Sequence, residues 1–304
     1  MLSPLLISLS LLLIAPHAEQ ETTAPPEPIA RIAAVGASAT DGFGVFVVRE
    51  TPIGRVPTGW SLAKSLRAAS QNSVVVSDLG TSMFFLAPAK TGSRLFNRAL
   101  RADADMIIAI DFLFWFAYGN TGVDEELMDT PTERIAMIER GLKILDRFDG
   151  PMIIGDLPDM SGAIGKMLSR RQVPTTDVLA TLNARIHEWA AKRPRVRIFP
   201  LGEITATMRA GKPFSIGAHT WDGEAIKDLL QRDQLHPTIN GQIAMMQVLE
   251  EMIALDPEFS VRGPKLDADH DRMKVRISPP AKIQSEPETD TKEQESKAAK
   301  AKAA

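Results

Sequence analysis

Three residues near the two ends of the chain have the types that serine-dependent hydrolysis requires. Asp233 precedes His236 by three positions, and Ser38 follows an apolar, β-branched segment close to the N-terminus. One short loop can present Asp and His on the same side, so the carboxylate can hold one imidazole nitrogen while the other faces a serine from a different strand. We therefore predict that Ser38, Asp233 and His236 form a catalytic site.

The surroundings of both segments suit this chemistry. Ser38 lies just past the end of a predicted strand, and open α/β sheets bind their ligands at the carboxyl ends of strands. Taken alone, a serine among small residues is also what an ordinary turn contains. The Asp233 to His236 segment is followed by Pro237 and a predicted helix, and it makes the hydrolytic interpretation specific.

Together the two segments resemble the SGNH, or GDSL-like, hydrolase family. The first block of that family reads Gly-Asp-Ser-x-x-x-Gly, and here Gly36 to Ser38 with Gly42 matches it, except that Ala37 replaces the aspartate. The last block reads Asp-x-x-His-Pro, and Asp233 to Pro237 matches it in full. The resemblance implies a serine hydrolase acting on ester bonds.

Alternating strand and helix patterns separate the two blocks. Five apolar, β-branched runs predict strands, namely Ile29 to Val35, Val74 to Leu79, Met106 to Ile110, Met152 to Leu157 and Val196 to Leu201. Helical spacing of apolar residues predicts helices at Trp60 to Ala69, Thr132 to Phe148, Thr176 to Lys192 and Ile239 to Leu255. The alternation predicts stacked βα units. The resemblance, which spans about 29–255, implies a three-layer α/β/α sandwich, flavodoxin-like, around a parallel sheet of about five strands.

The resemblance also implies an oxyanion hole, for which the backbone amides of Ser38 and Gly80 are candidates. The family adds an Asn side chain after the third strand, and Asp111 occupies the aligned position. An ionised carboxylate cannot donate a hydrogen bond, and loss of one donor costs about 2.7–4 kcal/mol. Three alternatives remain open: apolar neighbours keep Asp111 protonated, Asn120 supplies the missing amide, or Asp111 is structural and caps a nearby amide.

Few other residues suggest chemistry. Trp115, His219 and Trp221 are candidates for lining a substrate pocket, with simple packing as the alternative. The chain contains no cysteine, which excludes thiol catalysis and disulfides. No cluster of His, Asp and Glu has the spacing of metal ligands, so we expect neither a metal nor another cofactor.

The N-terminal residues predict export. Residues 1–18 resemble a secretory signal peptide, with an uncleaved membrane anchor as the alternative, and 19–27 form a polar, flexible lead-in. Residues 28–260 form the predicted hydrolase-like domain. Residues 261–304 are predicted to be a weakly structured to disordered tail whose partners the sequence does not identify. After signal cleavage we expect no stable membrane span.

These features favour an exported, periplasmic or extracellular serine hydrolase. Its expected substrate is a small-molecule, glycan or lipid ester, which makes it esterase-like, lipase-like or a carbohydrate O-deacylase. With a net charge of −3 over 304 residues, nucleic acid is not an expected partner. One alternative is a catalytically weak or inactive SGNH-fold binding protein of the cell envelope, because of Asp111. Another is an envelope scaffold in which the C-terminal tail binds a partner.

Overall fold

A five-stranded parallel sheet forms the centre of the computed structural model, which describes residues 27–51, 54–122 and 127–278. The strand order is β4-β1-β5-β6-β7. The strands are β1 (Arg31–Gly36), β4 (Val75–Gly80), β5 (Met106–Ala109), β6 (Met152–Gly155) and β7 (Val196–Phe199). All five predicted strands are therefore confirmed. The predicted signal peptide and residues 279–304 of the predicted tail lie outside the described residues, as does most of the lead-in.

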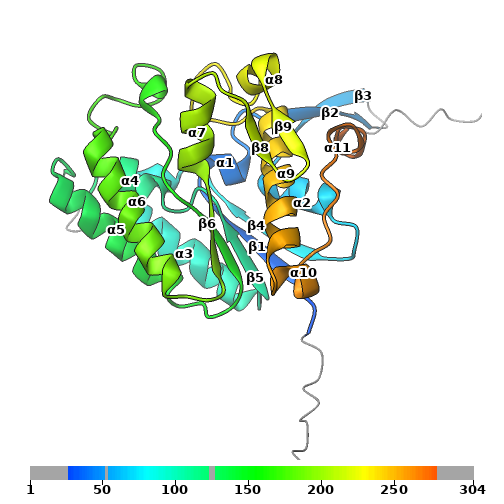
Figure 1. Cartoon of the computed structure of the whole chain (residues 1–304), viewed down its shortest axis with the longest axis horizontal. Helices are drawn as coiled ribbons and strands as arrows, with labels where there is room; N and C mark the ends of the chain where they lie inside the picture. The colour runs from blue at the N-terminus through cyan, green and yellow to red at the C-terminus, as the bar shows by residue number, and fades with distance from the viewer. Residues whose placement is uncertain (1–26, 52–53, 123–126, 279–304) are drawn as a thin grey trace, which may run out of the picture.

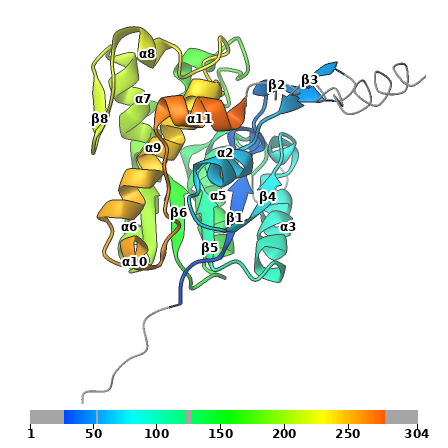
Figure 2. The same ribbon diagram turned by 90° about the vertical axis from the view of Figure 1, so that its right-hand side faces the viewer.

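Helices cover both faces of the sheet, as Figures 1 and 2 show. One face carries α3 (Pro88–Arg101), α4 (Phe114–Tyr118), α5 (Pro131–Leu145) and α6 (Thr176–Ala191). The other carries α2 (Leu62–Ala69), α9 (Ile239–Leu255), α10 (Phe259–Arg262) and α11 (His270–Ile277). Every residue of β5 and β6 is buried, as expected for strands covered on both sides. The predicted three-layer α/β/α sandwich is confirmed.

Three of the four predicted helices, α2, α5 and α9, begin at a residue whose side chain caps them. At α5, the Thr130 hydroxyl accepts a hydrogen bond from the Glu133 amide at 3.2 Å, and the Glu133 carboxylate accepts one from the Thr130 amide at 2.7 Å. This reciprocal pair satisfies amides that the first turn leaves without partners. At α2 the Ser61 side chain accepts from the Lys64 amide. The preceding residues 54–59 form a strand that the sequence pattern did not predict.

Several short elements gather at the carboxyl end of the sheet (Figure 1). These are α1 (Ser38–Asp41), the hairpin of β2 (Phe46–Thr51) and β3 (Gly54–Gly59), α7 (Leu201–Arg209), the hairpin of β8 (Phe214–Ile216) and β9 (His219–Trp221), and α8 (Gly223–Lys227). Two single turns of 3₁₀ helix, Phe84–Leu86 and Ser161–Ala163, follow β4 and β6. Within the described ranges we find no helix with the length and apolar character of a membrane span.

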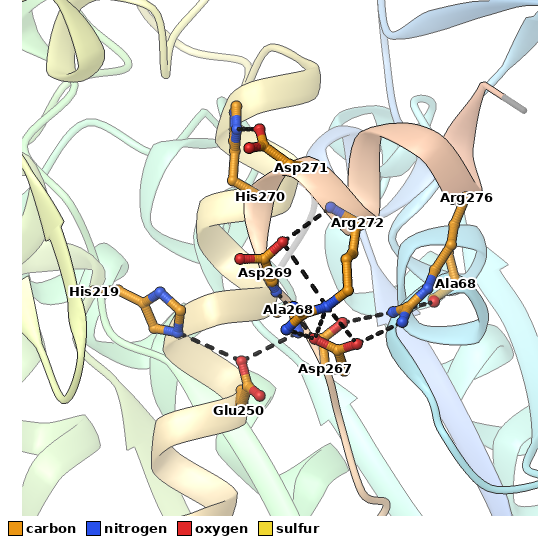
Figure 3. A network of polar contacts seen from close by, with 10 residues as sticks. All are labelled: Ala68, His219, Glu250, Asp267, Ala268, Asp269, His270, Asp271, Arg272 and Arg276. Carbon is orange, nitrogen blue, oxygen red and sulfur yellow. Dashed lines mark hydrogen bonds and ion pairs between the residues drawn. The ribbon is translucent and has the colours of Figure 1, made fainter. Parts of the chain in front are cut away.

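The segment after α10 is folded, so the prediction of a weakly structured tail from residue 261 is wrong for residues 261–278. Its backbone docks on the end of α2, where the Asp267 amide donates to the Ala69 carbonyl at 2.8 Å. The Asp267 carboxylate then accepts hydrogen bonds from Arg272 and Arg276 of α11 (Figure 3). The segment buries Leu266, Ala268, Met273 and Ile277. The apolar residues of α11, which are Met273, Val275 and Ile277, are spaced two apart among charges, and this spacing did not indicate a helix.

Candidate active site

Ser38 is the first residue of α1, two positions after the last residue of β1. β1 ends at Gly36, and the chain enters the four-residue helix through Ala37. The Ser38 carbonyl accepts a hydrogen bond from the Phe43 amide at 2.9 Å, which closes the turn after α1. This connection places the serine side chain at the carboxyl end of the sheet, partly exposed to solvent.

A tight loop between α8 and α9 presents Asp233 and His236. The Gln231 amide donates to the His236 carbonyl at 2.8 Å, and Gln234 has a left-handed backbone with φ 60°, so the chain reverses within a few residues. One oxygen of Asp233 accepts hydrogen bonds from the amides of Leu235 at 2.9 Å and His236 at 3.0 Å. The carboxylate therefore organises the loop that carries it.

The structure brings Ser38, His236 and Asp233 together. His236 Nε2 lies 2.9 Å from Ser38 Oγ, and His236 Nδ1 lies 2.7 Å from Asp233 Oδ2. Burial raises the pKa of Asp233, but hydrogen bonds from His236 and Leu235 outweigh it, so this pKa lies below its ordinary value of 3.8. An ionised Asp233 can accept a hydrogen bond from Nδ1–H, which leaves the Nε2 lone pair facing the serine hydroxyl.

Neighbouring side chains shield and fix the histidine. The His236 side chain is only 3% exposed. The Phe43 ring lies over the imidazole, with 4.6 Å between ring centroids. Gln231 Nε2 donates to the carbonyls of Phe43 at 2.8 Å and Pro237 at 2.9 Å, joining the exit of α1 to the histidine loop. The imidazole therefore has little freedom to leave the serine.

Asp111 accepts hydrogen bonds from the turn that holds Ser38. Its Oδ1 accepts from the Ala37 amide at 2.9 Å and the Thr40 hydroxyl at 2.6 Å, and its Oδ2 accepts from the amides of Ala39 at 2.8 Å and Thr40 at 3.1 Å. The Ser38 amide is not among these donors. Burial raises the pKa of Asp111, and the hydrogen bonds from Thr40, Ala37 and Ala39 oppose that rise only in part.

This arrangement matches the alternative in which Asp111 caps nearby amides. Both of its oxygens are taken up as acceptors, so neither is directed at a substrate oxygen as a donor. The contribution of Asp111 to an oxyanion hole stays a prediction that these contacts do not favour. Asn120 is exposed and follows the end of α4, where its carbonyl accepts from the Met128 amide at 2.7 Å. Its role as a donor is untested.

Two glycines allow this close packing around α1. A Cβ at Gly36 would lie 1.9 Å from Asp111 Oδ1 and 2.3 Å from Thr40 Oγ1. A Cβ at Gly80 would lie 2.5 Å from the Asp41 nitrogen. Any side chain at either position would push α1 away from the strands. Gly80 therefore lies against the turn that carries Ser38.

A cavity of about 120 Å³ opens beside Ser38 and His236. Its wall is mostly apolar and includes one side of α7, with Leu201, Ile204 and Met208, and one side of α9, with Ala244, Met245 and Val248. Of the three residues suggested as pocket lining, Trp221 is in the wall. Trp115 lies outside it and packs on Phe85, while Phe114, its neighbour on α4, faces the cavity. His219 faces Glu250 of α9 instead, 3.4 Å away (Figure 3).

Gln242 is a site residue that sequence reasoning missed. It is fully buried on α9, and its Nε2 donates to the Ala39 carbonyl at 2.9 Å. Its Oε1 has no hydrogen-bond partner among the described residues. The bond connects α9, which begins just after His236, to α1, which begins with Ser38. A glutamine within a strongly apolar helix was the available signal, because a buried amide needs a partner.

Among the described residues, no three His, Asp or Glu side chains gather closely enough to hold a metal ion. His187 lies 3.3 Å from Asp156, and His219 lies 3.4 Å from Glu250 and 3.9 Å from Glu251. The groups described around Ser38 can transfer protons and donate hydrogen bonds. They supply what nucleophilic attack on a carbonyl requires from protein side chains.

Comparisons with known proteins give structural neighbours only. No protein-family model matches the chain, and no curated protein does. The chain is similar to a mutant of Axe2, an acetyl-xylooligosaccharide esterase from Geobacillus stearothermophilus, with 13% identity over 77% of this chain and 98% of that one, and a TM-score of 0.48. An α/β hydrolase enzyme from the metagenome of Lake Arreo, Spain, has 14% identity over 75% and 95%, with a TM-score of 0.46.

A gut microbial diltiazem-metabolizing enzyme has 11% identity over 75% of this chain and 47% of its own, with a TM-score of 0.45. The chain thus spans about half the length of that neighbour. Similarity at this level assigns no activity to the chain. The function has to be argued from the residues of the site.

Proposed function

We propose that the protein is an exported serine hydrolase that cleaves carboxylic esters, with Ser38 as nucleophile, His236 as general base and Asp233 as its orienting group. The observation that carries this proposal is the continuous pair of contacts from Ser38 through His236 to Asp233, at 2.9 and 2.7 Å. The serine and the histidine are 198 positions apart in the chain. Such a connected serine, imidazole and carboxylate is the arrangement that activates a hydroxyl for attack.

The proposed reaction proceeds in two halves. Ser38 Oγ attacks the ester carbonyl carbon while His236 Nε2 takes the hydroxyl proton, and the carbonyl oxygen becomes an oxyanion. The C–O bond to the leaving alcohol then breaks as His236 returns the proton to it, which leaves an acyl group on Ser38. Water attacks this acyl-enzyme with the same proton transfers and releases the carboxylic acid.

The oxyanion is assigned in this proposal to the backbone amides of Ser38 and Gly80. Asp111 supports this because it accepts from the amides on either side of Ser38 and not from the Ser38 amide. The membership of the SGNH family remains part of the proposal, as does the secretory signal in residues 1–18. The alternative of an inactive binding protein is supported by Asp111, which does not add a side-chain donor to the two backbone amides of the proposed oxyanion hole.

Labelling by a fluorophosphonate probe, which reacts with activated serines, tests the proposal directly. We expect wild-type protein to incorporate one probe molecule and Ser38→Ala to incorporate none. Hydrolysis of p-nitrophenyl butyrate should likewise be lost in Ser38→Ala, with the thermal midpoint nearly unchanged. A wild-type protein that neither reacts with the probe nor hydrolyses esters would favour the binding-protein alternative.

A further inference from the structure

Few polar side chains lie in the wall of the cavity beside Ser38. They are Ser38, His236, Asp111, Thr205 and the indole of Trp221. The Thr205 hydroxyl donates to the Leu201 carbonyl of its own helix at 2.8 Å, and Asp111 is fully occupied by residues 37–40. Among the described wall residues outside the proposed catalytic site, this leaves the indole N–H of Trp221 to bind a sugar, and that group can only donate.

The rest of the wall is built to contact hydrocarbon. Residues spaced three to four apart on α7 and α9 place one apolar stripe of each helix on the cavity. Phe214 and Trp221 close it from the β8–β9 hairpin, with 5.5 Å between their ring centroids. His219, on the same hairpin, pairs with Glu250 of α9 at 3.4 Å, so the hairpin is held against α9, which also lines the cavity.

The size of the cavity limits the chain that it accepts. An apolar cavity of roughly 150 Å³ holds a benzene molecule. By proportion, about 120 Å³ accommodates about five carbon atoms. The cavity begins at Ser38 and His236, so a chain inside it is attached to the reacting ester group.

We propose that this cavity binds an unbranched aliphatic chain of about five carbons attached to the ester group of the substrate. This inference rests on the proposed function and adds the substrate class, a short-chain aliphatic ester rather than an acetylated sugar. Each methylene that enters an apolar site gains about threefold to fourfold in binding. The value of kcat/KM should therefore rise by about 100-fold from the acetate to the hexanoate ester, and should not rise further for the dodecanoate.

Two series of substrates test this, one p-nitrophenyl ester series with acyl chains from acetate to dodecanoate and one series of alkyl acetates from ethyl to dodecyl. A steep rise with chain length in either series supports the cavity and identifies which side of the ester enters it. If kcat/KM is independent of chain length in both series, the inference is overturned while the serine hydrolase proposal stands.

Substitutions in the wall and outside it provide the structural control. Met245 and Met252 are both half-buried methionines on α9, but only Met245 lines the cavity. Met245→Trp should lower the ratio of hexanoate to acetate turnover at least tenfold, whereas Met252→Trp should leave it within about twofold. Met208→Ala, at a half-buried position on α7, should move the optimum to chains longer by two or three carbons. Equal ratios in Met245→Trp and Met252→Trp would contradict the assignment.

A binding measurement separates this inference from the proposed activity. Hexanoate and acetate are titrated into Ser38→Ala, with and without Met245→Trp, in a calorimeter. We expect hexanoate to bind at least tenfold more tightly than acetate, and Met245→Trp to abolish most of that difference. Absence of hexanoate binding overturns the cavity assignment. Hexanoate binding in a protein that never reacts with a fluorophosphonate probe would instead retain the cavity and reject the hydrolase.

Discussion

Asp111 Oδ1 lies 2.6 Å from the hydroxyl of Thr40, and both side chains are buried beneath the turn that carries Ser38. Together with three backbone amides, this contact makes Asp111 the anchor of α1. Asparagine at position 111 has one acceptor oxygen in place of two and would turn an NH₂ group toward backbone N–H groups. At least one buried amide would then lack a partner.

We expect Asp111→Asn to lower the free energy of unfolding by about 2 kcal/mol, since each unsatisfied buried group costs about 1–3 kcal/mol. Displacement of Ser38 should also reduce kcat about 10-fold to 100-fold. Thr40→Val, which removes only the hydroxyl contact, should cost about 1 kcal/mol. Chemical denaturation and ester turnover measure both effects. A gain of activity at neutral pH in Asp111→Asn would instead identify Asp111 as an oxyanion donor.

Asp233→Asn is expected to stop catalysis while the loop stays folded. The asparagine oxygen can still accept from the amides of Leu235 and His236, but its NH₂ group would donate to His236 Nδ1. The proton would then reside on Nε2, where the base function is lost, so kcat should fall on the order of 10⁴-fold. Proton NMR of the imidazole gives an independent view of the tautomer. Near-normal turnover would show that the carboxylate does not orient the histidine.

Gln242→Leu should affect activity more than stability. It removes the hydrogen bond to the Ala39 carbonyl, but it also removes a buried oxygen that has no partner, so the two effects on stability oppose each other. We expect a thermal midpoint within about 2 °C of wild type and a kcat lowered about threefold to tenfold, since α1 loses one positioning contact. Gln247→Leu, at a second buried glutamine further along α9, serves as the matched control. Equal kcat values in the two variants would argue against a positioning role.

Asp267 predicts a pH-dependent contribution to stability. Hydrogen bonds from Arg272 hold the pKa of Asp267 well below its ordinary value of 3.8. Burial raises this pKa in part, and hydrogen bonds from Arg276 lower it further. A lowered folded-state pKa contributes stability at pH values above the unfolded pKa, and that contribution is lost as the pH falls through the folded pKa. Asp267→Asn should therefore cost about 1–2 kcal/mol at pH 7 and progressively less below pH 4. Calorimetric midpoints at pH 7 and pH 3 provide the comparison, and a constant difference would contradict the assignment.

The inner strands β1, β5 and β6 could be predicted because they are buried on both faces, apart from Arg31 at the start of β1. Runs such as Met106–Ile108 in β5 are continuous and apolar, and this pattern can be recognised without knowing which strands are neighbours in the sheet. The β2–β3 hairpin and α11 were missed for the opposite reason. Phe46 and Val48 are exposed in β2, and α11 has only Met273 and Ile277 buried, so neither segment carries a strong period.

The candidate site also has parts that the sequence could predict and parts that it could not. Asp233 and His236 are three positions apart, and their geometry follows from one loop. The cavity depends on α7, the β8–β9 hairpin and α9, whose contributions meet only in the folded chain, so Met208 and Met245 gave no local signal. For Asp111, the sequence identified an unusual residue type but could not choose among its roles. The choice depends on the distances to Ala37, Ala39 and Thr40, which only the structure gives.

The separation of Ser38 and His236 by 198 positions has a consequence for protein synthesis. A ribosome that adds about 5–20 residues per second needs about 10–40 s to travel from the serine codon to the histidine codon. During that interval the nascent chain contains the serine without the imidazole that would take its proton. Reactivity toward a fluorophosphonate probe can arise only after the histidine loop has emerged and docked. Probe incorporation into ribosome-bound chains of increasing length would therefore mark the moment at which the two ends of the fold first meet.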